Sequence, residues 1–377
     1  MSVTDIPPKV KFQLWALSGG RCEIRGCNKL LSESAFASKR YNAGIFAHIV
    51  ADSPDGPRGN SSSKDLADKI ENIMFVCPNC HKLIDSEENL SLYTVEELTK
   101  MKKEHEDRIK QVTGITEDLK CHSITYFPRV GSIPNIFDEN VLKNAMLPEF
   151  TTNGEIIRLY MDNSYIKDNE NVFWDLEKRN LEELYKESVL PLISKGKVSR
   201  LAVFALAPMP LLIRLGTLLT DKTSVSIYQK HRVPDTWKWL NEDIGDFKYI
   251  VEEPNSNNSI VALNLSLSGT IDNSRIYSVL SDDVSVWKLT IEEPSNDFVR
   301  NKEQVEMFNK IMRELFEVIK RKHGHNITLH VFPACPISLC IELGRVWMPK
   351  CDMNLSIYDE NTSRNGFIHC FDIVNDY

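Results

Sequence analysis

The 377-residue sequence lacks any long apolar run. No stretch approaches the ~20 apolar residues of a membrane-spanning helix, and residues 1–11 contain no apolar segment of the kind that a signal peptide carries. The composition therefore predicts no membrane span, and we expect a cytoplasmic protein. At this length two or three domains are expected.

An excess of basic residues is also missing. The net charge is −8; residues 1–115 contain 16 Lys+Arg against 16 Asp+Glu, and the remainder contains 29 against 37. Neither part has the basic surface expected of a protein that binds DNA strongly by itself. If the chain acts on DNA, weak single sites held together in an oligomer would gain affinity by avidity.

A disulfide framework is absent as well. Five of the nine cysteines show no framework spacing and are expected as reduced thiols: Cys121, Cys335, Cys340, Cys351 and Cys370. The other four form two close pairs, Cys22/Cys27 and Cys77/Cys80. Each short loop can present two thiolates to one ion, so the sequence predicts a tetrahedral structural Zn²⁺ that clamps the two loops together.

Three polar residues near these cysteines need another explanation, because a four-thiolate site is already closed. His48 lies between the pairs, Asn72 precedes the second pair, and His81 directly follows Cys80. In this order and spacing the first 110 or so residues resemble the HNH endonucleases, whose ββα-metal motif is often stapled by such a zinc.

The resemblance implies a role for each residue in phosphodiester hydrolysis. His48 is expected to be the general base, Asn72 to brace the loop that carries it, and His81 to hold a catalytic Mg²⁺. The alternative for His48 is a structural histidine. Many family members have a metal-binding Asp before the base, and here that position is Ala47.

The remaining ligands of the catalytic metal are therefore open, with Asp85, Asp52 or water as candidates. Basic residues near the loop at 53–63 are candidates for contacts to the DNA backbone; a solvated loop is the alternative. These residues are Lys39, Arg40, Arg58 and Lys64. His105, on a helix predicted to begin with a capping box at Thr94, is expected to be a packed or surface histidine rather than a metal ligand.

The second part of the chain contains an internal repeat. Residues 204–216 align with residues 332–344, and residues 225–228 align with 355–358. Each unit has the pattern of a buried strand, a proline turn, an apolar helix and a second strand, which predicts two Rossmann-like halves on mostly parallel sheet. Gly216 and Gly344 lie within the helices, which indicates close approach of a neighbouring element, with each other as the candidate partners.

The predicted organisation is an α+β zinc-stapled ββα-metal domain at 1–115, a connector and start of the second domain at 116–150, and an α/β domain at 151–377. Ligands of open α/β sheets bind where strands end and helices begin, and helix N-termini favour phosphate. Two similar half-sites would suit a cyclic dinucleotide. Gene duplication also produces such halves without that ligand.

The second part also resembles a SAVED domain, a fusion of two CARF-like units that senses cyclic oligonucleotides in CBASS anti-phage defence. The resemblance rests on the repeated turns and helices, on residues 228–232 and 237–239, and on residues 266–270. The two resemblances together imply an HNH–SAVED effector nuclease. Its activator would be a cyclic dinucleotide, its active form a homo-oligomer and its substrate double-stranded DNA, cleaved without sequence preference.

Four residues are the candidates for the ligand pocket. Trp174 and Tyr228 offer aromatic faces of the kind that hold unpaired bases, although Trp174, Trp237 and Trp239 could equally be core. Arg232 follows a strand and could meet a phosphate, and Thr270 lies in the 266–270 motif. The positions after Tyr358 are Asp359, Glu360 and Asn361, so the pocket is not chemically symmetric.

Two other functions remain open. A restriction-type HNH endonuclease with a C-terminal DNA-reading domain would be active without any nucleotide, but the acidic second part counts against it. A non-enzymatic sensor whose HNH metal site is lost is supported only by Ala47.

Overall fold

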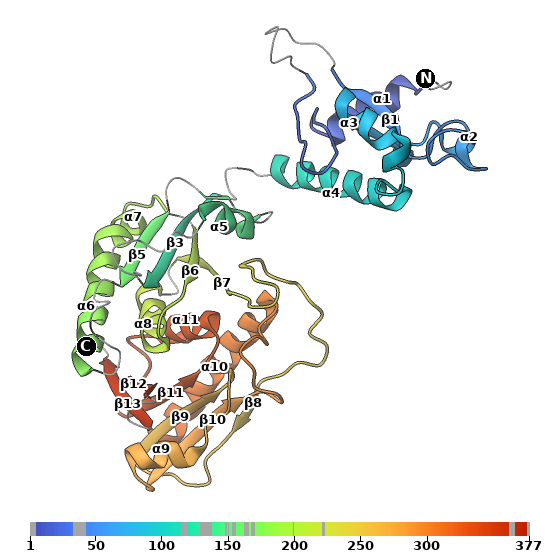
Figure 1. Ribbon diagram of the computed structural model, residues 1–377. Helices are drawn as coiled ribbons and strands as arrows, with labels where there is room; N and C mark the ends of the chain where they lie inside the picture. Colours follow the sequence, from blue (N-terminus) through green and yellow to red (C-terminus); the bar gives the residue numbers. More distant parts are fainter. Residues whose placement is uncertain are drawn as a thin grey trace. The chain divides into compact units, whose positions relative to one another are not determined.

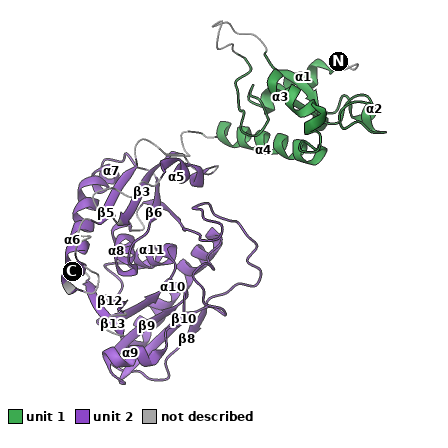
Figure 2. Cartoon of the chain, viewed as in Figure 1, with its two compact units in different colours: residues 1–116 green, residues 117–377 purple. Residues whose placement is uncertain are grey.

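The computed structural model describes residues 5–32, 43–114, 116, 120–128, 138–147, 149, 151–152, 156–161, 166, 170–198, 200–220, 223–361 and 366–374. The chain divides into two compact units, residues 1–116 and 117–377 (Figure 2). Lys39 and Arg40, candidates for DNA contact, lie outside the described residues. Within the described ranges, no helix combines the length and the apolar character needed to cross a membrane.

Unit 1 is organised around an antiparallel strand pair followed by a helix. Strand β1 (Ile45–His48) pairs with β2 (Ile73–Val76), and α3 (Pro78–Asp85) follows directly. Phe75 of β2 is fully buried, and its ring lies 4.9 Å from those of Trp15 and Phe46 (centroid to centroid). The other elements are α1 (Pro8–Leu17), α2 (Ser63–Leu66), η1 (Ile70–Asn72), η2 (Glu87–Asn89) and α4 (Val95–Thr113).

Helix α4 begins where the sequence predicts. The Thr94 hydroxyl accepts a hydrogen bond from the backbone N–H of Glu97 (3.2 Å). The Glu97 carboxylate pairs with Arg25 (2.6 Å). His105 is buried, and its Nε2 lies 2.9 Å from the carbonyl oxygen of Ser18, so of the two predicted roles, packed or surface histidine, it has the packed one.

Unit 2 contains two sheets (Figure 1). The first has the order β4-β3-β6-β7, with β5 also paired to β3, and the second has the order β13-β12-β11-β9-β10-β8. The strands of the first sheet are β3 (Lys120–Pro128), β4 (Thr151–Thr152), β5 (Ile157–Met161), β6 (Arg200–Ala205) and β7 (Ser224–Tyr228). The strands of the second are β8 (Ile250–Glu252), β9 (Ile260–Ser266), β10 (Val284–Thr290), β11 (Thr328–Ala334), β12 (Asn354–Asn361) and β13 (Gly366–Ile373).

The helices of unit 2 connect these strands. They are α5 (Glu139–Met146), α6 (Asn171–Ser188), α7 (Leu190–Ser194), α8 (Met209–Leu219), α9 (Asn273–Leu280), α10 (Lys302–His323) and α11 (Ile337–Val346). Strand β3 pairs in parallel with β5 on one side and β6 on the other, so it is a central strand of its sheet. The stretch 116–150, predicted as a connector and start of the second domain, thus supplies a central strand of unit 2.

The two halves of unit 2 share one topology. In the first half β3, α5, β5, α6, β6, α8 and β7 occur in this order, with the short β4 and α7 inserted before β5 and β6; in the second half β9, α9, β10, α10, β11, α11 and β12 occur in the same order. Numbered along the chain, the four parallel strands of each half lie in the order two-one-three-four. The prediction of two Rossmann-like halves is confirmed, and the repeat extends well beyond the matched sequence.

The repeated helices cross at their glycines, where the backbones touch. A Cβ atom on Gly216 would lie 2.0 Å from the carbonyl oxygen of Ile341, and one on Gly344 would lie 2.0 Å from that of Ile213. The predicted close approach of α8 and α11 through these glycines is confirmed.

The aromatic cores of the halves repeat in the same way. Phe204 stacks on Tyr228 and Phe332 stacks on Tyr358, each pair with ring centroids 4.4 Å apart. These rings lie at equivalent positions of β6, β7, β11 and β12. Offset stacking of this kind is favourable beyond the area it buries, so the same packing solution stabilises both sheets.

Candidate functional site

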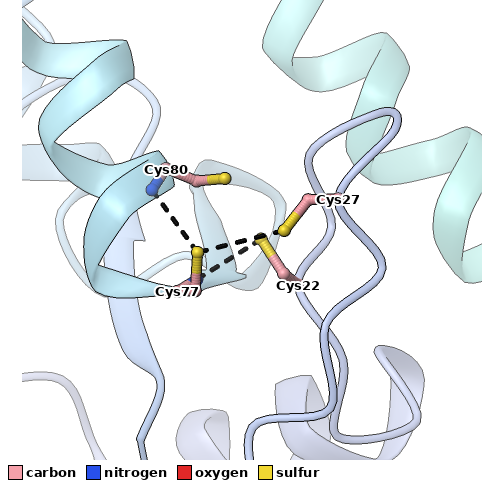
Figure 3. A group of neighbouring side chains, drawn as sticks. All are labelled: Cys22, Cys27, Cys77 and Cys80. Atoms are coloured by element: carbon pink, nitrogen blue, oxygen red, sulfur yellow. Dashed lines mark hydrogen bonds between the residues drawn. The ribbon is translucent and has the colours of Figure 1, made fainter.

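Four cysteines of unit 1 form a compact cluster (Figure 3). All are free thiols, and their sulfur atoms lie within 4.8 Å of one another, with 3.9 Å between Cys27 Sγ and Cys77 Sγ. A tetrahedral ion with metal–sulfur bonds of about 2.3 Å holds its sulfurs about 3.8 Å apart. The cluster is Cys22, Cys27, Cys77 and Cys80, and its geometry fits one Zn²⁺.

The surroundings of the cluster also suit metal-bound thiolates. Cys22 Sγ accepts a hydrogen bond from the backbone N–H of Cys77 (3.3 Å), and Cys77 Sγ accepts one from that of Cys80 (3.4 Å). Burial raises the pKa of the Cys22 thiol to about 12. This sulfur can therefore serve as a thiolate only beside a compensating positive charge, which a bound cation supplies.

His48 ends strand β1, opposite Ile73 of β2. Its Nε2 lies 2.9 Å from the carbonyl oxygen of Ala67. A carbonyl oxygen only accepts hydrogen bonds, so in the neutral ring Nε2 carries the proton and Nδ1 keeps its lone pair. The ring is thus held in the tautomer that can accept a proton at Nδ1.

Asn72 fixes the two segments that surround His48. Its buried side-chain amide accepts a hydrogen bond from the N–H of Val50 (2.8 Å) and donates to the carbonyl oxygens of Val50 (2.9 Å) and Leu66 (3.2 Å). Val50 lies two residues after His48, and Leu66 precedes Ala67. These contacts are the kind expected of a residue that braces the His48 loop.

Arg58 joins the His48 segment to helix α3, which carries His81. Its guanidinium donates to the carbonyl oxygens of Ile49 (2.7 Å) and Ile84 (2.6 Å) and to the Asp85 carboxylate (2.6 Å). The side chain is only 6% exposed. The expectation that Arg58 contacts DNA is therefore wrong, because its donors are bound inside unit 1. Lys64, the other candidate here, lies exposed on α2.

His81 lies on α3 with its Nε2 3.5 Å from Asp85 Oδ2, one helical turn further on. Of the two carboxylates considered as partners of His81, Asp85 is thus in contact with it. Ala47, which the HNH resemblance aligns with a metal ligand of many family members, is buried in the core of unit 1. Among the described residues, only the four cysteines form a group of three or more potential metal ligands.

In unit 2 the strand ends and helix starts of the two halves come together. The backbone N–H of Cys335, just before α11, donates to Met209 Sδ at the start of α8 (3.3 Å). Gln229, directly after β7, accepts hydrogen bonds from the N–H (3.0 Å) and hydroxyl (2.8 Å) of Ser338 on α11. A side chain of the first half thus caps a helix of the second. Sequence reasoning missed Gln229, although its place after a predicted strand was a usable signal.

The loop after β9 is shaped by a buried polar network. The Ser266 hydroxyl donates to the Asn264 side chain (2.7 Å) and accepts from the N–H of Ile271 (2.9 Å). Asn264 also donates to the carbonyl oxygen of Ile271 (2.9 Å). The loop lies between β9 and β11, where the strand order reverses, which is where open α/β sheets bind ligands.

The structure does not gather the four predicted ligand residues into one pocket. Trp174 and Tyr228 are each only 1% exposed and belong to different core clusters. Arg232 and Thr270 are exposed; Arg232 follows β7, and Thr270 lies in the loop after β9. Trp174 and Tyr228 therefore pack in the core and cannot stack on a base, whereas Arg232 and Thr270 are accessible to a ligand.

Residues 181–373 match the family model of SAVED, the SMODS-associated and fused to various effectors sensor domain. No curated protein matches the chain significantly. Among solved structures, the Acinetobacter baumannii Cap4 SAVED/CARF-domain containing receptor with the cyclic trinucleotide 3'3'3'-cAAA is 11% identical, with a TM-score of 0.45 over 76% of this chain and 67% of that one. The same receptor with 2'3'3'-cAAA is 10% identical, with a TM-score of 0.45 over 77% and 67%. The Moraxella osloensis Cap4 SAVED/CARF-domain containing receptor is 13% identical, with a TM-score of 0.37 over 83% and 70%.

Proposed function

Because the chain belongs to the SAVED family, whose model matches more than half of its residues, we propose that it is a DNA endonuclease switched on by a cyclic oligonucleotide in anti-phage defence. Unit 2 is the sensor and unit 1 the HNH effector. The observation that carries the nuclease assignment is the oriented imidazole of His48, with its Nε2 held by the Ala67 carbonyl and Nδ1 left as the acceptor.

The proposed reaction is hydrolysis of a phosphodiester. His48 Nδ1 takes a proton from water as the water oxygen bonds to phosphorus, one ester P–O bond breaks, and the leaving oxygen is protonated by solvent. Asn72 keeps the His48 segment in place. His81, with Asp85 as the neighbouring carboxylate, would hold a Mg²⁺ ion, which would supply charge stabilisation for the leaving oxygen.

The four-cysteine cluster is proposed as a structural Zn²⁺ site. The two pairs come from segments fifty residues apart, and a single ion bound to all four would join the loop after α1 to the start of α3. Since β2 directly precedes α3, this clamp also fixes the strand opposite His48.

The activator is proposed to bind at the strand ends of unit 2, where α8 and α11 begin. The two halves have the same topology, so this region offers two similar half-sites to a ring of linked nucleotides. Thr270 lies in the loop at one of them, and Arg232 follows β7. Binding is proposed to drive assembly of a homo-oligomer, in which several near-neutral effector units act on double-stranded DNA together.

The test is plasmid cleavage in Mg²⁺ by the full chain, alone and with a panel of cyclic di- and trinucleotides. Cleavage should require one nucleotide and should fall about 10²- to 10⁴-fold in His48→Ala. His325→Ala, at an exposed histidine of unit 2, is the matched control and should cleave normally. Calorimetric binding of the activating nucleotide to His48→Ala would show that its sensor remains folded.

Two outcomes would favour other functions. Cleavage without any nucleotide would favour a restriction-type endonuclease. Nucleotide binding without cleavage under any condition would favour a non-enzymatic sensor, the function to which the buried Ala47 points.

A further inference from the structure

The two halves of unit 2 differ at one sheet edge. In the second half, β12 is covered by the antiparallel strand β13. Its counterpart in the first half, β7, pairs with β6 on one side, and among the described residues no strand pairs with its other edge. An edge strand of this kind presents backbone N–H and C=O groups to whatever lies beside it.

A cavity of about 410 Å³ lies along this edge of β7. Its walls come from β7, from the helices α10 and α11 of the other half, and from Trp239. We call this cavity the β7 groove. On the β7 and α10 sides, the cavity is lined by Val225, Ser226, Ile227, Val305, Glu306 and Asn309.

The β7 wall of the groove repeats the strand that β13 covers. Residues 225–227 align with residues 355–357 of β12. In β12, Leu355 lies opposite Ile373, Ser356 opposite Asp372, and Ile357 opposite Phe371. The three β7 residues that line the groove are thus equivalent to three β12 residues that pair with β13.

The α10 wall repeats the helix that packs on β13. Arg214 of α8 bonds Glu182 of α6 (2.8 Å), and Glu342, equivalent to Arg214, bonds Asn309 of α10. Asn309 of α10 therefore corresponds to Glu182 of α6. One helical turn before these two residues, Val305 corresponds to Lys178.

Lys178 holds β13 in place. Its Nζ donates to the carbonyl oxygen of Asp372 (3.1 Å) and lies 5.4 Å from the centre of the Phe371 ring. Its equivalent, Val305, faces the β7 groove. Both walls of the groove therefore match the walls of a site that a strand fills elsewhere in the same molecule.

We propose that the β7 groove binds an extended segment of a partner protein, which adds to the first sheet as a strand antiparallel to β7. The segment carries an apolar, an acidic and an apolar residue in succession, the pattern of Phe371, Asp372 and Ile373 in β13. In β13 the two apolar side chains are buried and the acidic one is exposed. Main-chain hydrogen bonds provide affinity and the alternating side chains provide selectivity.

The chain's own β13 is not the natural occupant. All of its residues from Gly366 to Ile373 lie in the strand that already pairs with β12. A second copy could donate β13 only by uncovering its own β12, which disfavours that strand as the occupant; the proposal therefore commits to a segment from another protein. This inference does not depend on the proposed nuclease activity or on the activator.

The probe is a synthetic peptide with the β13 sequence of residues 366–373 and serine in place of Cys370, added to the full chain. It should slow hydrogen exchange of the β7 amides, residues 224–228, and bind saturably by fluorescence anisotropy.

Substitutions in the β7 groove test whether the peptide binds there. Val305→Trp fills the cavity and should weaken peptide binding about tenfold or more, whereas Val279→Trp, at an exposed valine of α9, should not. Val305→Lys recreates the equivalent of Lys178 and should bind the peptide at least as tightly as the unmodified chain. This second variant tests the groove without filling it.

Three results would overturn the proposal. One is the absence of protection at β7 with millimolar peptide. Another is protection confined to β12 and β13, which would indicate exchange with the chain's own strand. The third is concentration-dependent protection of β7 without peptide, which would make a second copy the occupant.

Discussion

Replacing Arg58 with Ala removes a side chain that ties three places in unit 1 together. Its guanidinium donates to the backbone next to His48, to the carbonyl oxygen of Ile84 and to the Asp85 carboxylate, and it is only 6% exposed. Hydrogen bonds of charged groups contribute about 1.5–3 kcal/mol each, and neutral ones about 1 kcal/mol. In the variant, water replaces part of each lost contact. We therefore expect the unfolding free energy of unit 1 to fall by about 3 kcal/mol, at the lower end of the values for breaking a buried ion pair.

The assay is native-state hydrogen exchange of the full chain, read at the amides of β2. Exchange there should accelerate in Arg58→Ala, while amides of β9 in unit 2 should be unchanged. Arg58→Lys keeps the charge but cannot reach all three acceptors, so its effect should be intermediate. Lys64→Ala, at an exposed cation of α2, is the control.

A change of less than about 0.5 kcal/mol in the opening free energy of the β2 amides in Arg58→Ala would contradict this prediction, because surface substitutions usually change stability by no more than that. The prediction also fails if the variant alters only the DNA concentration needed for half-maximal cleavage. The first result would mean that the three contacts of Arg58 contribute little to stability, and the second would return Arg58 to the role of a DNA contact.

Three further predictions concern other parts of the chain. Gly216→Ala should destabilise unit 2 by about 1–3 kcal/mol in chemical denaturation, because the clash with the Ile341 carbonyl outweighs the ~1 kcal/mol gain in helix propensity. Removing the metal with a chelator should release one zinc per chain by mass spectrometry and accelerate exchange in unit 1 alone. Burial lowers the pKa of His231, so unfolding takes up a proton below about pH 6.5, and the stability of unit 2 should fall there less steeply in His231→Phe.

Each of these predictions has a contradicting result. Gly216→Ala with unchanged stability would mean that α8 and α11 separate easily. Chelation without loss of protection in unit 1 would remove the structural zinc. Identical pH curves for His231→Phe and the unmodified chain would show that the native environment of His231 does not shift its pKa.

The sequence alone predicted the features that depend on local pattern. The aligned residues 204–216 and 332–344 correctly indicated two strand–helix units, and the glycines within them indicated a close helix crossing. Side-chain period and turn residues are sufficient for such predictions. The spacing of the cysteine pairs likewise anticipated that four sulfurs meet, because short loops restrict where they can lie.

Features set by distant contacts could not be predicted in this way. Arg58 had the pattern of a loop cation, and only the folded chain places Ile84 and Asp85 within its reach. Trp174 and Tyr228 had the residue types of a base-binding site, but the packing of α6 and β7 buries them. Within the part of the chain that the structure describes, the unpaired edge of β7 becomes apparent only by comparison with β12 and its added strand.

The glycine crossing also bears on how the two halves have evolved. Elsewhere in the repeat the two copies differ at several positions; Arg214 aligns with Glu342, for example, and Pro210 with Ser338. At the crossing, each glycine sits against the backbone of the other helix, and no side-chain rearrangement in the partner can make room for a methyl group. A larger residue at either position thus requires the helices to separate, so the duplicated halves inherit this contact as a joint constraint that neither copy can relax alone.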